Sequence, residues 1–316
     1  MKQHTYLDGN SIGHAAQHGA KQKMYAGDRE TTAIYGTLRS VRKIMKARSH
    51  SQPIVLWDGR SWRYSVFPDY KGTRDDTAQK QADRDRYKAQ RRAMFHGLHL
   101  LGVRQLLSGN MEADDLAAML TRRAVGNGDK VTLITGDQDW IQLVEPGVVW
   151  VDHKVDRKVN TSNFHEFTGF RTPRQFIDSK GLAGDSGDNI KPRTGVGKKG
   201  AQSLFSVFES ADEFLAMDHY EVKERYFIHH GKRLPKKLVD LHLNNDGVRD
   251  RFLWARSLMD LGHPDIPKPD KIKASHKPLD RDGFTKFCME HSFTSILQSM
   301  DHFLTPFETM NQGVSS

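Results

Sequence analysis

Three short apolar runs in the first half of the chain each lead to an aspartate, and this pattern constrains the fold most strongly. TYL ends at Asp8, PIVLW ends at Asp58, and VTLIT leads through a glycine to Asp137. Segments with helical periodicity separate these runs, which is typical of an α/β layer fold. Binding sites of open parallel sheets lie beyond the carboxyl ends of the strands. The sequence therefore predicts a mostly parallel, twisted sheet flanked by helices, with these carboxylates at one edge.

An acidic segment, MEADDLAAML, begins a predicted helix between the second and third runs. Leu116 and Leu120 recur at helical spacing on its apolar face, and Glu112, Asp114 and Asp115 lie in or beside its first turn. The helix dipole favours acidic residues there, so any one of them could serve stability alone. Three carboxylates within four positions instead indicate a binding role.

The stretch GDSGDNI, residues 184–190, raises a choice between turn formation and metal binding. Its small and polar residues are those of any tight surface turn. Its aspartates gain a functional interpretation because other carboxylates are predicted to gather at one edge of the sheet. The candidate metal ligands are Asp8, Asp58, Glu112, Asp114, Asp115, Asp137, Asp139, Asp185 and Asp188.

These nine candidates are all carboxylates, and no histidine or cysteine belongs to their motifs. A set of oxygen ligands selects Mg²⁺ or Mn²⁺ over zinc. Carboxylates held together without cations would repel one another and weaken the fold. Two such ions suit hydrolysis of a phosphodiester by in-line attack of water. We therefore expect a nuclease with two Mg²⁺ ions, for which Mn²⁺ substitutes, and no organic cofactor.

Basic residues outnumber acidic ones, with 48 Lys and Arg against 39 Asp and Glu and a formal net charge of +9. This balance favours a polyanionic partner, most often nucleic acid. Basic residues concentrate in a predicted helix within residues 75–103 and around a Gly-rich turn within residues 191–199. A solvated helix and a plain connection remain alternative interpretations of these two segments. The candidate DNA contacts are Lys80, Arg84, Lys88, Arg91, Arg92, Lys191, Arg193, Gly195, Gly197, Lys198 and Lys199.

The segment FPDYKGTR follows the strand that ends at Asp58 and supplies three candidate catalytic residues. Lys71 and Arg74 could stabilise the scissile phosphate from the side opposite the metal ions, although ordinary surface solvation also explains such residues. Tyr70 could stack on a terminal base or simply pack.

Strand signals fade after about residue 170. We therefore expect an α/β nuclease core in residues 1–170 and a mainly helical region in residues 171–316. Capping-box patterns at Thr172 and Ser210 predict two helix starts in the second region. Residues 262–282 read as an irregular connector.

Cysteine usage and hydropathy predict a cytoplasmic protein. The single cysteine, Cys288, excludes an intramolecular disulfide and a Cys-rich zinc site. The N-terminus lacks the apolar core of a secretory signal, and no run approaches the roughly 20 apolar residues of a membrane span. We expect no membrane partner.

The motifs YLDGNS, WDG, RYSVFPDYKGTR, MEADDLAAML, LITGDQDWIQLV and GDSGDNIKPRTGVGKKGAQSLF occur in one order along residues 5–210. In order and spacing they resemble the flap endonuclease and 5′-to-3′ exonuclease family, which includes bacteriophage 5′ nucleases and the 5′ nuclease domain of bacterial DNA polymerase I. The resemblance implies a PIN-like nuclease core, a helical arch at about residues 75–103 and a helix-three-turn-helix DNA-binding element at about residues 176–206. We expect no polymerase domain, as in the stand-alone phage-type enzymes, and a host-cytoplasmic location if the chain is phage-encoded.

The resemblance also implies roles for single residues. Asp8, Asp58, Glu112, Asp114 and Asp115 match ligands of a first metal region, and the four later aspartates match a second one, some acting through water. Lys71 and Arg74 match the family's active-site cations, and Tyr70 matches their aromatic neighbour. One departure concerns the loop DNIKPRTGVG, which is more basic than the common DNIPGVPGIG-like loop.

The expected function is a divalent-metal-dependent 5′ nuclease acting on DNA, both as a 5′-to-3′ exonuclease and as a flap endonuclease. Its expected partners are DNA with 5′ ends or 5′ flaps and replication proteins. Removal of RNA primers from RNA–DNA hybrids uses the same chemistry and remains an alternative. A non-catalytic DNA-binding protein on the same fold is a second alternative, although no candidate ligand is missing here.

Overall fold

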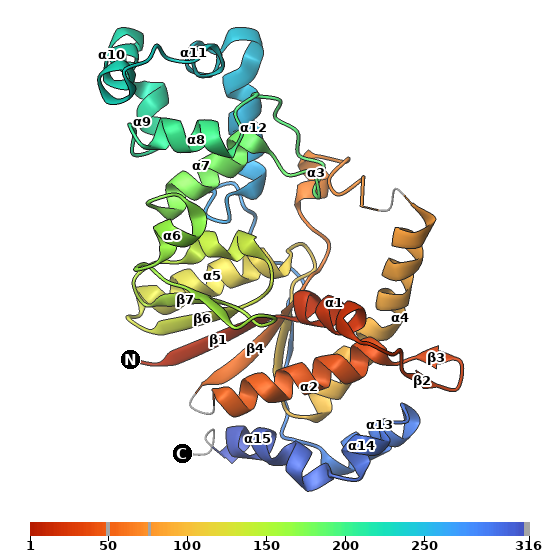
Figure 1. Ribbon diagram of the computed structural model, residues 1–316. Helices are drawn as coiled ribbons and strands as arrows, with labels where there is room; N and C mark the ends of the chain where they lie inside the picture. The colour runs from red at the N-terminus through yellow and green to blue at the C-terminus, as the bar shows by residue number, and fades with distance from the viewer. Residues whose placement is uncertain (49–50, 75–76, 313–316) are drawn as a thin grey trace.

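A seven-stranded sheet forms the centre of the protein in the computed structural model, which describes residues 1–48, 51–74 and 77–312 (Figure 1). The strand order is β8-β7-β6-β1-β4-β5-β9. The inner pairings are parallel, whereas β8 and β9 pair antiparallel at the two edges. The expected α/β fold with a mostly parallel sheet is confirmed. The strands are β1 (Gln3–Asp8), β4 (Gln52–Trp57), β5 (Arg104–Leu107), β6 (Lys130–Ile134), β7 (Val148–Asp152), β8 (Arg157–Val159) and β9 (Lys273–Ser275), and a separate hairpin joins β2 (Tyr25–Ala26) to β3 (Arg29–Glu30).

Strand β1 lies in the middle of the sheet, between β4 and β6. Leu7 pairs with Val55 on one side and with Ile134 on the other. Because the three strands are parallel, their carboxyl ends reach the same edge of the sheet. The convergence of the strand ends is therefore a property of the backbone.

The strands alternate between two hydrophobic cores, because successive side chains point to opposite faces of a sheet. Leu7 and Val55 pack into one core, and Tyr6 and Leu56 pack into the other. Helices of the first core are α1 (Gly9–Gly19), α2 (Thr32–Ala47), α4 (Ala78–Leu100), α13 (Arg281–Glu290), α14 (Thr294–Leu297) and α15 (Met300–Gln312), and α5 (Ala113–Gly126) and η1 (Gln138–Leu143) cover the second.

A stack of helices, green and cyan in Figure 1, extends from the sheet domain and has its own core. Its two predicted helix starts are confirmed: Thr172 Oγ1 accepts a hydrogen bond from the amide of Gln175, and Ser210 Oγ accepts one from the amide of Glu213. Across the described ranges, no helix combines the length and the apolar character that crossing a bilayer requires. The helices of this stack are α7 (Pro173–Ala183), α8 (Lys198–Phe205), α9 (Ala211–Ala216), α10 (His219–His230), α11 (Lys236–Leu243) and α12 (Val248–Met259), whereas α6 (Phe164–Thr168) packs into the second core of the sheet domain.

The last part of the chain returns to the sheet domain. Strand β9 pairs with β5 at the sheet edge, and α13 and α15 contact α4 and α2. Residues 262–282, expected as an irregular connector, therefore contain a strand. Its three residues are too short to show a periodicity in the sequence. The expected boundary at residue 170 therefore does not separate two packing units. Helices α13 to α15 follow it in the sequence but pack against helices that precede it.

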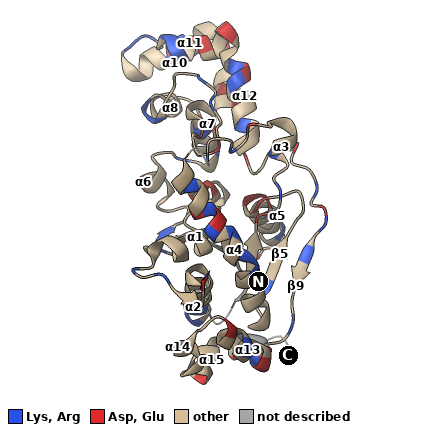
Figure 2. Ribbon diagram, turned by 90° about the vertical axis from the view of Figure 1, so that its right-hand side faces the viewer, with Lys and Arg blue, Asp and Glu red and all other residues tan. Residues whose placement is uncertain are grey.

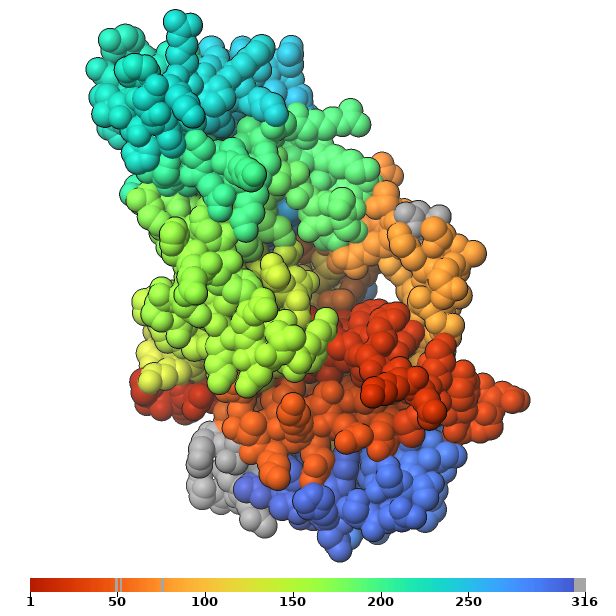
Figure 3. Space-filling view, viewed as in Figure 1, coloured from red at the N-terminus to blue at the C-terminus, as the bar shows by residue number. Residues whose placement is uncertain are grey.

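Helix α4 is buried mainly along its C-terminal half, and in its N-terminal half Tyr87 is buried and the carbonyl of Asp83 accepts a hydrogen bond from Gln17. Met94 and Leu98 bury its C-terminal half, whereas its N-terminal half begins at Thr77, whose hydroxyl accepts a hydrogen bond from the amide of Lys80. Figure 3 shows an opening between α4 and the body of the molecule. The segment before it contains the short helix α3 (Arg63–Val66), and residues 75 and 76 of the expected arch lie outside the described residues.

Candidate active site

Asp8 ends β1 and caps α1, so one residue joins the sheet edge to a helix. Its Oδ1 accepts a hydrogen bond from the amide of Ser11 at 2.9 Å, and its Oδ2 accepts one from Thr135 Oγ1 at 2.8 Å. Thr135 follows the neighbouring strand β6, so the hydrogen bond fixes the carboxylate between two strand ends. Asp8 is therefore buried and held by neutral donors.

Asp58 occupies the corresponding place after β4. Its Oδ1 accepts a hydrogen bond from the amide of Ala113, the first residue of α5, at 2.8 Å. Asp114 follows in that helix and accepts a hydrogen bond from Trp140 Nε1 at 2.6 Å. The strand ends and α5 thus bring carboxylates to a cavity of about 380 Å³. Its lining consists of Asp8, Asn10, Ser11, His14, Asp58, Lys71, Arg74, Glu112, Asp114, Gly136, Asp137, Gln138 and Lys154.

One part of this cavity concentrates negative charge away from water. Burial and the nearby Asp58 raise the pKa of Asp8 to about 7. Burial and Glu112 raise the pKa of Asp58, and burial and Asp137 raise the pKa of Asp114. Asp8, Asp58 and Asp114 form no ion pair with any residue that the structure describes. A buried carboxylate without a counter-ion is costly, so this part of the cavity favours a bound cation.

Glu112, on the same wall, is surrounded by positive charge. Its Oε1 pairs with Lys71 Nζ, and its Oε2 accepts a hydrogen bond from Ser61 Oγ at 2.9 Å and lies 3.2 Å from Arg63 Nη1. Burial acts to raise the pKa of Glu112, but Lys71 and Arg63 outweigh it, so the pKa is lowered. Glu112 is therefore ionised in this arrangement.

Tyr70 connects two walls of the site through its hydroxyl. The oxygen lies 2.9 Å from Glu112 Oε2 and 2.8 Å from Asp188 Oδ2. Its side chain is buried, with 3% of the residue exposed, and its ring contacts Tyr64 edge-on with 5.3 Å between centroids. Of the two sequence-based interpretations, packing describes this residue, because the ring has no free face on which a base could stack.

The aspartates of GDSGDNI form a turn beside the cavity. Asp185 Oδ1 accepts hydrogen bonds from the amides of Gly187 at 2.8 Å and Asp188 at 3.2 Å. Asp188 Oδ1 in turn pairs with Arg74, which lines the cavity. These contacts support the turn interpretation, whereas the metal-ligand interpretation of the two aspartates stays a prediction.

Lys180 of α7 ties the later aspartates together. Its Nζ pairs with Asp139 and lies 3.6 Å from Asp185 Oδ2. Asp137 stands at the exposed rim, where its Oδ1 accepts a hydrogen bond from the amide of Asp139 at 2.8 Å. Among the four later aspartates, only Asp137 lines the cavity itself.

Asp115 differs most from the expected role. Only 2% of it is exposed, and its two oxygens each lie 3.0 Å from Arg63. Its Oδ2 also accepts a hydrogen bond from the amide of Glu112, which closes a capping box at the start of α5. Asp115 is absent from the cavity lining, and it positions Arg63, which contacts Glu112.

The donor set fits divalent cations, although the side chains are not arranged around an ion. In the described part of the chain, no three Asp, Glu, His or Cys side chains already surround one point as ligands would. Lys71, Arg74 and Lys180 neutralise the outer carboxylates instead. Asp8, which is buried, and the half-buried Asp58 and Asp114 keep only neutral donors, and such carboxylate oxygens suit Mg²⁺ or Mn²⁺.

The expected DNA contacts on α4 fall into different environments. Arg91 is half-buried: it donates a hydrogen bond to the carbonyl oxygen of Asp58, and its guanidinium lies 5.8 Å from the centroid of Trp57. Arg92 is exposed, and Lys88 is exposed with its Nζ 3.7 Å from Asp85. Lys80 is exposed and Arg84 is half-buried, and blue bands in Figure 2 mark basic positions along this helix.

The basic segment 191–199 connects α7 to α8. Its Lys191, Arg193, Lys198 and Lys199 are exposed, and the intervening Pro192, Thr194 and Val196 are buried. Gly195 has φ of +70°, a conformation that glycine adopts easily, and Gly197 precedes the first residue of α8. The alternation leaves the four basic side chains exposed to solvent.

Several cavity residues were missed by the sequence analysis because they belong to no charged motif. Asn10 and His14 lie one turn apart on α1, and the His14 ring stacks on Tyr87 with 3.7 Å between centroids. Burial lowers the pKa of His14 to about 4, so it is neutral near pH 7. Asn10 and His14 follow Asp8 by two and six residues, and this closeness to a candidate ligand was the sign in the sequence that they could line the same cavity. Lys154 has no comparable signal, because the turn after β7 brings it to the cavity.

Comparison with known proteins is consistent with this geometry. Residues 3–169 match the family described as 5′-3′ exonuclease, N-terminal resolvase-like domain. The chain is 32% identical over 206 residues to flap endonuclease Xni of Shewanella sediminis, covering 63% of this chain and 78% of that protein. It is 27% identical over 297 residues to thermostable DNA polymerase I of Thermus thermophilus, covering 92% of this chain and 32% of the polymerase. The chain thus spans about a third of the length of that relative.

The fold is also that of a solved phage enzyme. The flap endonuclease of bacteriophage T5, in a pseudo-enzyme-product complex with DNA and metal ions, superimposes with a TM-score of 0.64 at 20% identity. The match covers 98% of this chain and 100% of the phage enzyme's chain. At this identity the likeness establishes the fold, which extends over both halves of the molecule.

Proposed function

This chain belongs to the 5′-3′ exonuclease family and is a 5′ nuclease of the flap endonuclease type, and we propose that it hydrolyses DNA at 5′ ends and 5′ flap junctions with two Mg²⁺ ions. One observation carries the proposal. Asp8, Asp58 and Asp114 are brought together without any ion pair among the described residues, directly beside the cations Lys71 and Arg74 in the same cavity.

The carboxylates divide into two proposed metal regions. The first would be held by Asp8, Asp58, Glu112 and Asp114, with Asp115 acting indirectly through Arg63. The second would be held by the later aspartates, some of them through water. Bound Mg²⁺ would supply an activated water and would offset the charge that develops on the phosphate. Mn²⁺ has the same preference for oxygen ligands and should replace Mg²⁺. The ligands of the second region are Asp137, Asp139, Asp185 and Asp188.

Lys71 and Arg74 would orient the scissile phosphate. Both line the cavity, and each is paired with a carboxylate, Glu112 or Asp188. An incoming phosphate carries the same charge as these partners and competes with them for the ammonium and the guanidinium. Positive groups aimed at the phosphate stabilise the additional negative charge of the transition state.

DNA would be bound by the two basic segments. The exposed Lys88 and Arg92 on the free side of α4 would contact the single strand near its 5′ end, and segment 191–199 would contact the duplex. The α7–α8 pair with its connecting turns, within residues 176–206, would act as the helix-three-turn-helix element. Each assignment is supported by exposure and charge.

Substitution of single carboxylates tests this function. Asp114→Asn and Asp188→Asn keep the side-chain shape but remove a charge. We expect each to slow flap cleavage by about 10²–10³-fold while DNA affinity in EDTA changes less than about twofold. Asp265→Asn, at an exposed position outside the cavity lining, is the matched control. Wild-type turnover in both active-site variants would contradict the proposal.

A substrate panel tests the substrate class. A DNA flap, a recessed 5′ end and an RNA-primed hybrid would be compared with Mg²⁺, Mn²⁺ or EDTA, each with a 5′ label. We expect cleavage of the two DNA substrates with either ion and none in EDTA. Faster cleavage of the hybrid than of either DNA substrate would assign primer removal instead.

A further inference from the structure

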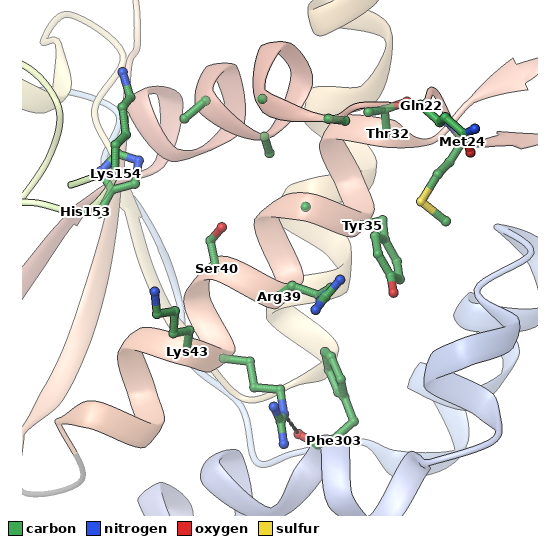
Figure 4. A pocket seen from close by; sticks show the side chains of 16 residues that line it. Gln22, Met24, Thr32, Tyr35, Arg39, Ser40, Lys43, His153, Lys154 and Phe303 are labelled. Atoms are coloured by element: carbon green, nitrogen blue, oxygen red, sulfur yellow. Dashed lines mark hydrogen bonds between the residues drawn. The ribbon is translucent and has the colours of Figure 1, made fainter. Parts of the chain in front are cut away.

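Exposed basic side chains gather on two further surfaces of the sheet domain. Figure 4 shows one of them, the cavity between α1 and α2, with Arg39 and Lys43 on α2. The other is formed by the loop after β4 and by the segment that leads into β9, which are far apart in the sequence. We call it the β9 basic row, and it consists of four exposed residues, Arg60, Lys268, Lys271 and Lys273.

Hydrogen bonds hold the β9 basic row beside the carboxyl end of β4. The amide of Arg60 donates to the carbonyl of Gly109 at 3.1 Å, and the amide of Gly109 donates to the carbonyl of Asp270 at 2.9 Å. Asn110 adds a side-chain contact, because its Nδ2 donates to the carbonyl of Lys268 at 2.9 Å. The lysines therefore belong to a segment that is joined, through the loop after β5, to the loop that follows Asp58.

Gly59 allows this close approach of loops. A β-carbon at its position would overlap the carbonyl oxygen of Ser108, so only glycine lets the loop after β4 pass so near the end of β5. The amide of Gly59 also donates to the carbonyl of Met111 at 2.8 Å. The contact between the two loops is thus part of the fold, and it fixes the β9 basic row relative to the acidic cavity.

The lysine of β9 lies on the same face of the sheet as α4. Lys273 pairs with Leu107, and residues paired across an antiparallel ladder point to the same face. Leu107 packs against the first core, to which α4 contributes. Ser275 of β9 is also in hydrogen-bond contact with His99 of α4. The β9 basic row therefore begins beside Asp58 and runs along the base of α4.

The cations of the β9 basic row are not neutralised by ion pairs. Across the described ranges, none of the four forms a salt bridge, and the exposed Asp270 is the one acidic residue within positions 268–273. Lysine on an edge strand often prevents pairing with another chain. That role applies to Lys273 alone, because the other three residues lie outside the strand. The remaining positive charge attracts a polyanion.

The opening beside α4 leads toward the β9 basic row. Figure 3 shows this opening face-on, and Figure 2 shows the molecule turned to the side. In Figure 2, α1 and α8 lie toward one side of the molecule, whereas α3 and β9 lie toward the other. A single strand that enters the opening from the side of α8 therefore leaves it on the side of β9.

We propose that the β9 basic row binds phosphates of the 5′ single strand of a flap after this strand has passed the acidic cavity. The inference rests on the proposed function, because it assumes that the acidic cavity holds the scissile phosphate. Contacts to phosphates carry no sequence information, so they suit a strand of any sequence. A long flap would reach the row, whereas a recessed 5′ end would be too short.

The first test measures binding by fluorescence anisotropy in EDTA at several salt concentrations. Its substrates are junctions that carry a flap of about 15 nucleotides or of a single nucleotide. The row variant is Lys268→Ala/Lys271→Ala/Lys273→Ala. The control, Lys130→Ala/Lys158→Ala/Lys286→Ala, removes the same charge from exposed positions elsewhere, including β8 at the opposite edge of the sheet.

We expect the row variant to bind the long flap about tenfold more weakly at low salt than the control does. The slope of log affinity against log salt should fall in magnitude by roughly two, for three lost contacts to a single strand. Both variants should bind the single-nucleotide flap equally. Equal affinity of the two variants for the long flap, or an equal loss with both flaps, would overturn the proposal.

Cross-linking locates the strand directly. Lys268→Cys is labelled with a photoactivatable aryl azide, and the native Cys288 is buried, which favours labelling of the new thiol. Lys158→Cys is the control. We expect Lys268→Cys to cross-link to nucleotides of the long flap and Lys158→Cys to none. Cross-links from Lys268→Cys to a duplex arm instead of the flap would contradict the proposal.

Cleavage with Mg²⁺ separates this inference from the proposed function. Wild-type protein that cleaves no flap contradicts the proposed function. If the wild type cleaves both flaps, the row variant should cleave the long flap more slowly than the control at protein concentrations below saturation, and the single-nucleotide flap at the same rate. Equal rates of the two variants on the long flap would overturn the inference and leave the proposed function intact.

Discussion

The hydroxyl of Tyr70 lies between two carboxylates, 2.9 Å from Glu112 and 2.8 Å from Asp188. A phenol has one proton, which it can donate to only one acceptor at a time. The other contact is tolerated because Lys71 pairs with Glu112 and Arg74 pairs with Asp188. The position of Tyr70 therefore joins the start of α5 to the turn at residues 184–190 and depends on the cations around it.

Removal of this hydroxyl should affect stability and catalysis together. Tyr70→Phe leaves the ring in place but deprives a buried carboxylate of its donor, so we expect the free energy of unfolding to fall by about 1–3 kcal/mol. The cleavage rate should fall more than DNA affinity, because the turn that carries Asp188 loses a tie to the cavity. Urea unfolding and single-turnover kinetics measure the two effects. Tyr25→Phe, at an exposed position, is the control and should change neither.

Stability of the metal-free protein should depend on the protonation of Asp8. Its pKa of about 7 in the folded protein exceeds the ordinary value, so the folded state binds more protons than the unfolded state between about pH 4 and pH 7. The free energy of unfolding contributed by this group therefore decreases as pH rises from about 4 to about 7 and levels off above that pH. Asp8→Asn should flatten the decrease between about pH 5 and pH 7 in EDTA. Identical pH profiles of the two proteins would show that Asp8 does not titrate there.

Magnesium should stabilise the folded protein most at higher pH. Protons compete with the cation for Asp8 and its neighbours, and these carboxylates are more fully ionised at pH 8 than at pH 6. Saturation at about 100 times the dissociation constant would add about 2.7 kcal/mol. Thermal unfolding with and without Mg²⁺ at both pH values measures this. The increase in Tm should be smaller in Asp114→Asn, and an equal increase would place the ion elsewhere.

Loss of Arg63 should be severe for stability. Its side chain is buried and lies within 3.2 Å of both Glu112 and Asp115, so Arg63→Met leaves two buried carboxylates short of a counter-ion. We expect destabilisation of about 3–5 kcal/mol. Arg29→Ala removes an exposed pair with Glu290 and should cost less than about 1 kcal/mol. Comparable losses in urea unfolding would show that the Arg63 pairs contribute no more than a surface pair.

Two adjacent arginines on α4 should behave differently. Arg92 is exposed, so Arg92→Ala should reduce flap cleavage and its salt dependence without changing Tm. Arg91 donates to the carbonyl of Asp58 and packs on Trp57, so Arg91→Ala should also lower Tm. Cleavage assays at several salt concentrations and thermal unfolding separate these effects. A lower Tm in both variants would assign both residues to the packing of α4.

The sequence predicted the edge of the sheet well because two local signals coincide there. Each apolar run is a strand, and Asp8, Asp58 and Asp137 follow three neighbouring strands in the observed order of the sheet. Parallel strands leave little choice about where their carboxyl ends meet. The fold class and the convergence of these carboxylates could thus be inferred without tertiary information.

The positions of Asp115 and Tyr70 could not be inferred in this way. Both residues belong to the motifs, as does Arg63 at the start of RYSVFPDYKGTR, but spacing along the chain gives no sign that Arg63 pairs with Asp115 and lies beside the Tyr70 ring. The same is true of Lys180, which arrives from α7 to neutralise Asp139. Periodicity and spacing describe one segment at a time, whereas these ion pairs depend on how distant segments pack.

The return of α13 to α15 to the sheet domain has a consequence for how the protein is made. Phe284 and Phe307, which belong to the same core as Leu7 and Val55, are synthesised after most of the chain has already left the ribosome. A nascent chain that already contains all the candidate metal ligands therefore still lacks part of its hydrophobic interior. A variant truncated before α13 should keep every candidate metal ligand but lose part of the first core, so we expect a lower free energy of unfolding in urea.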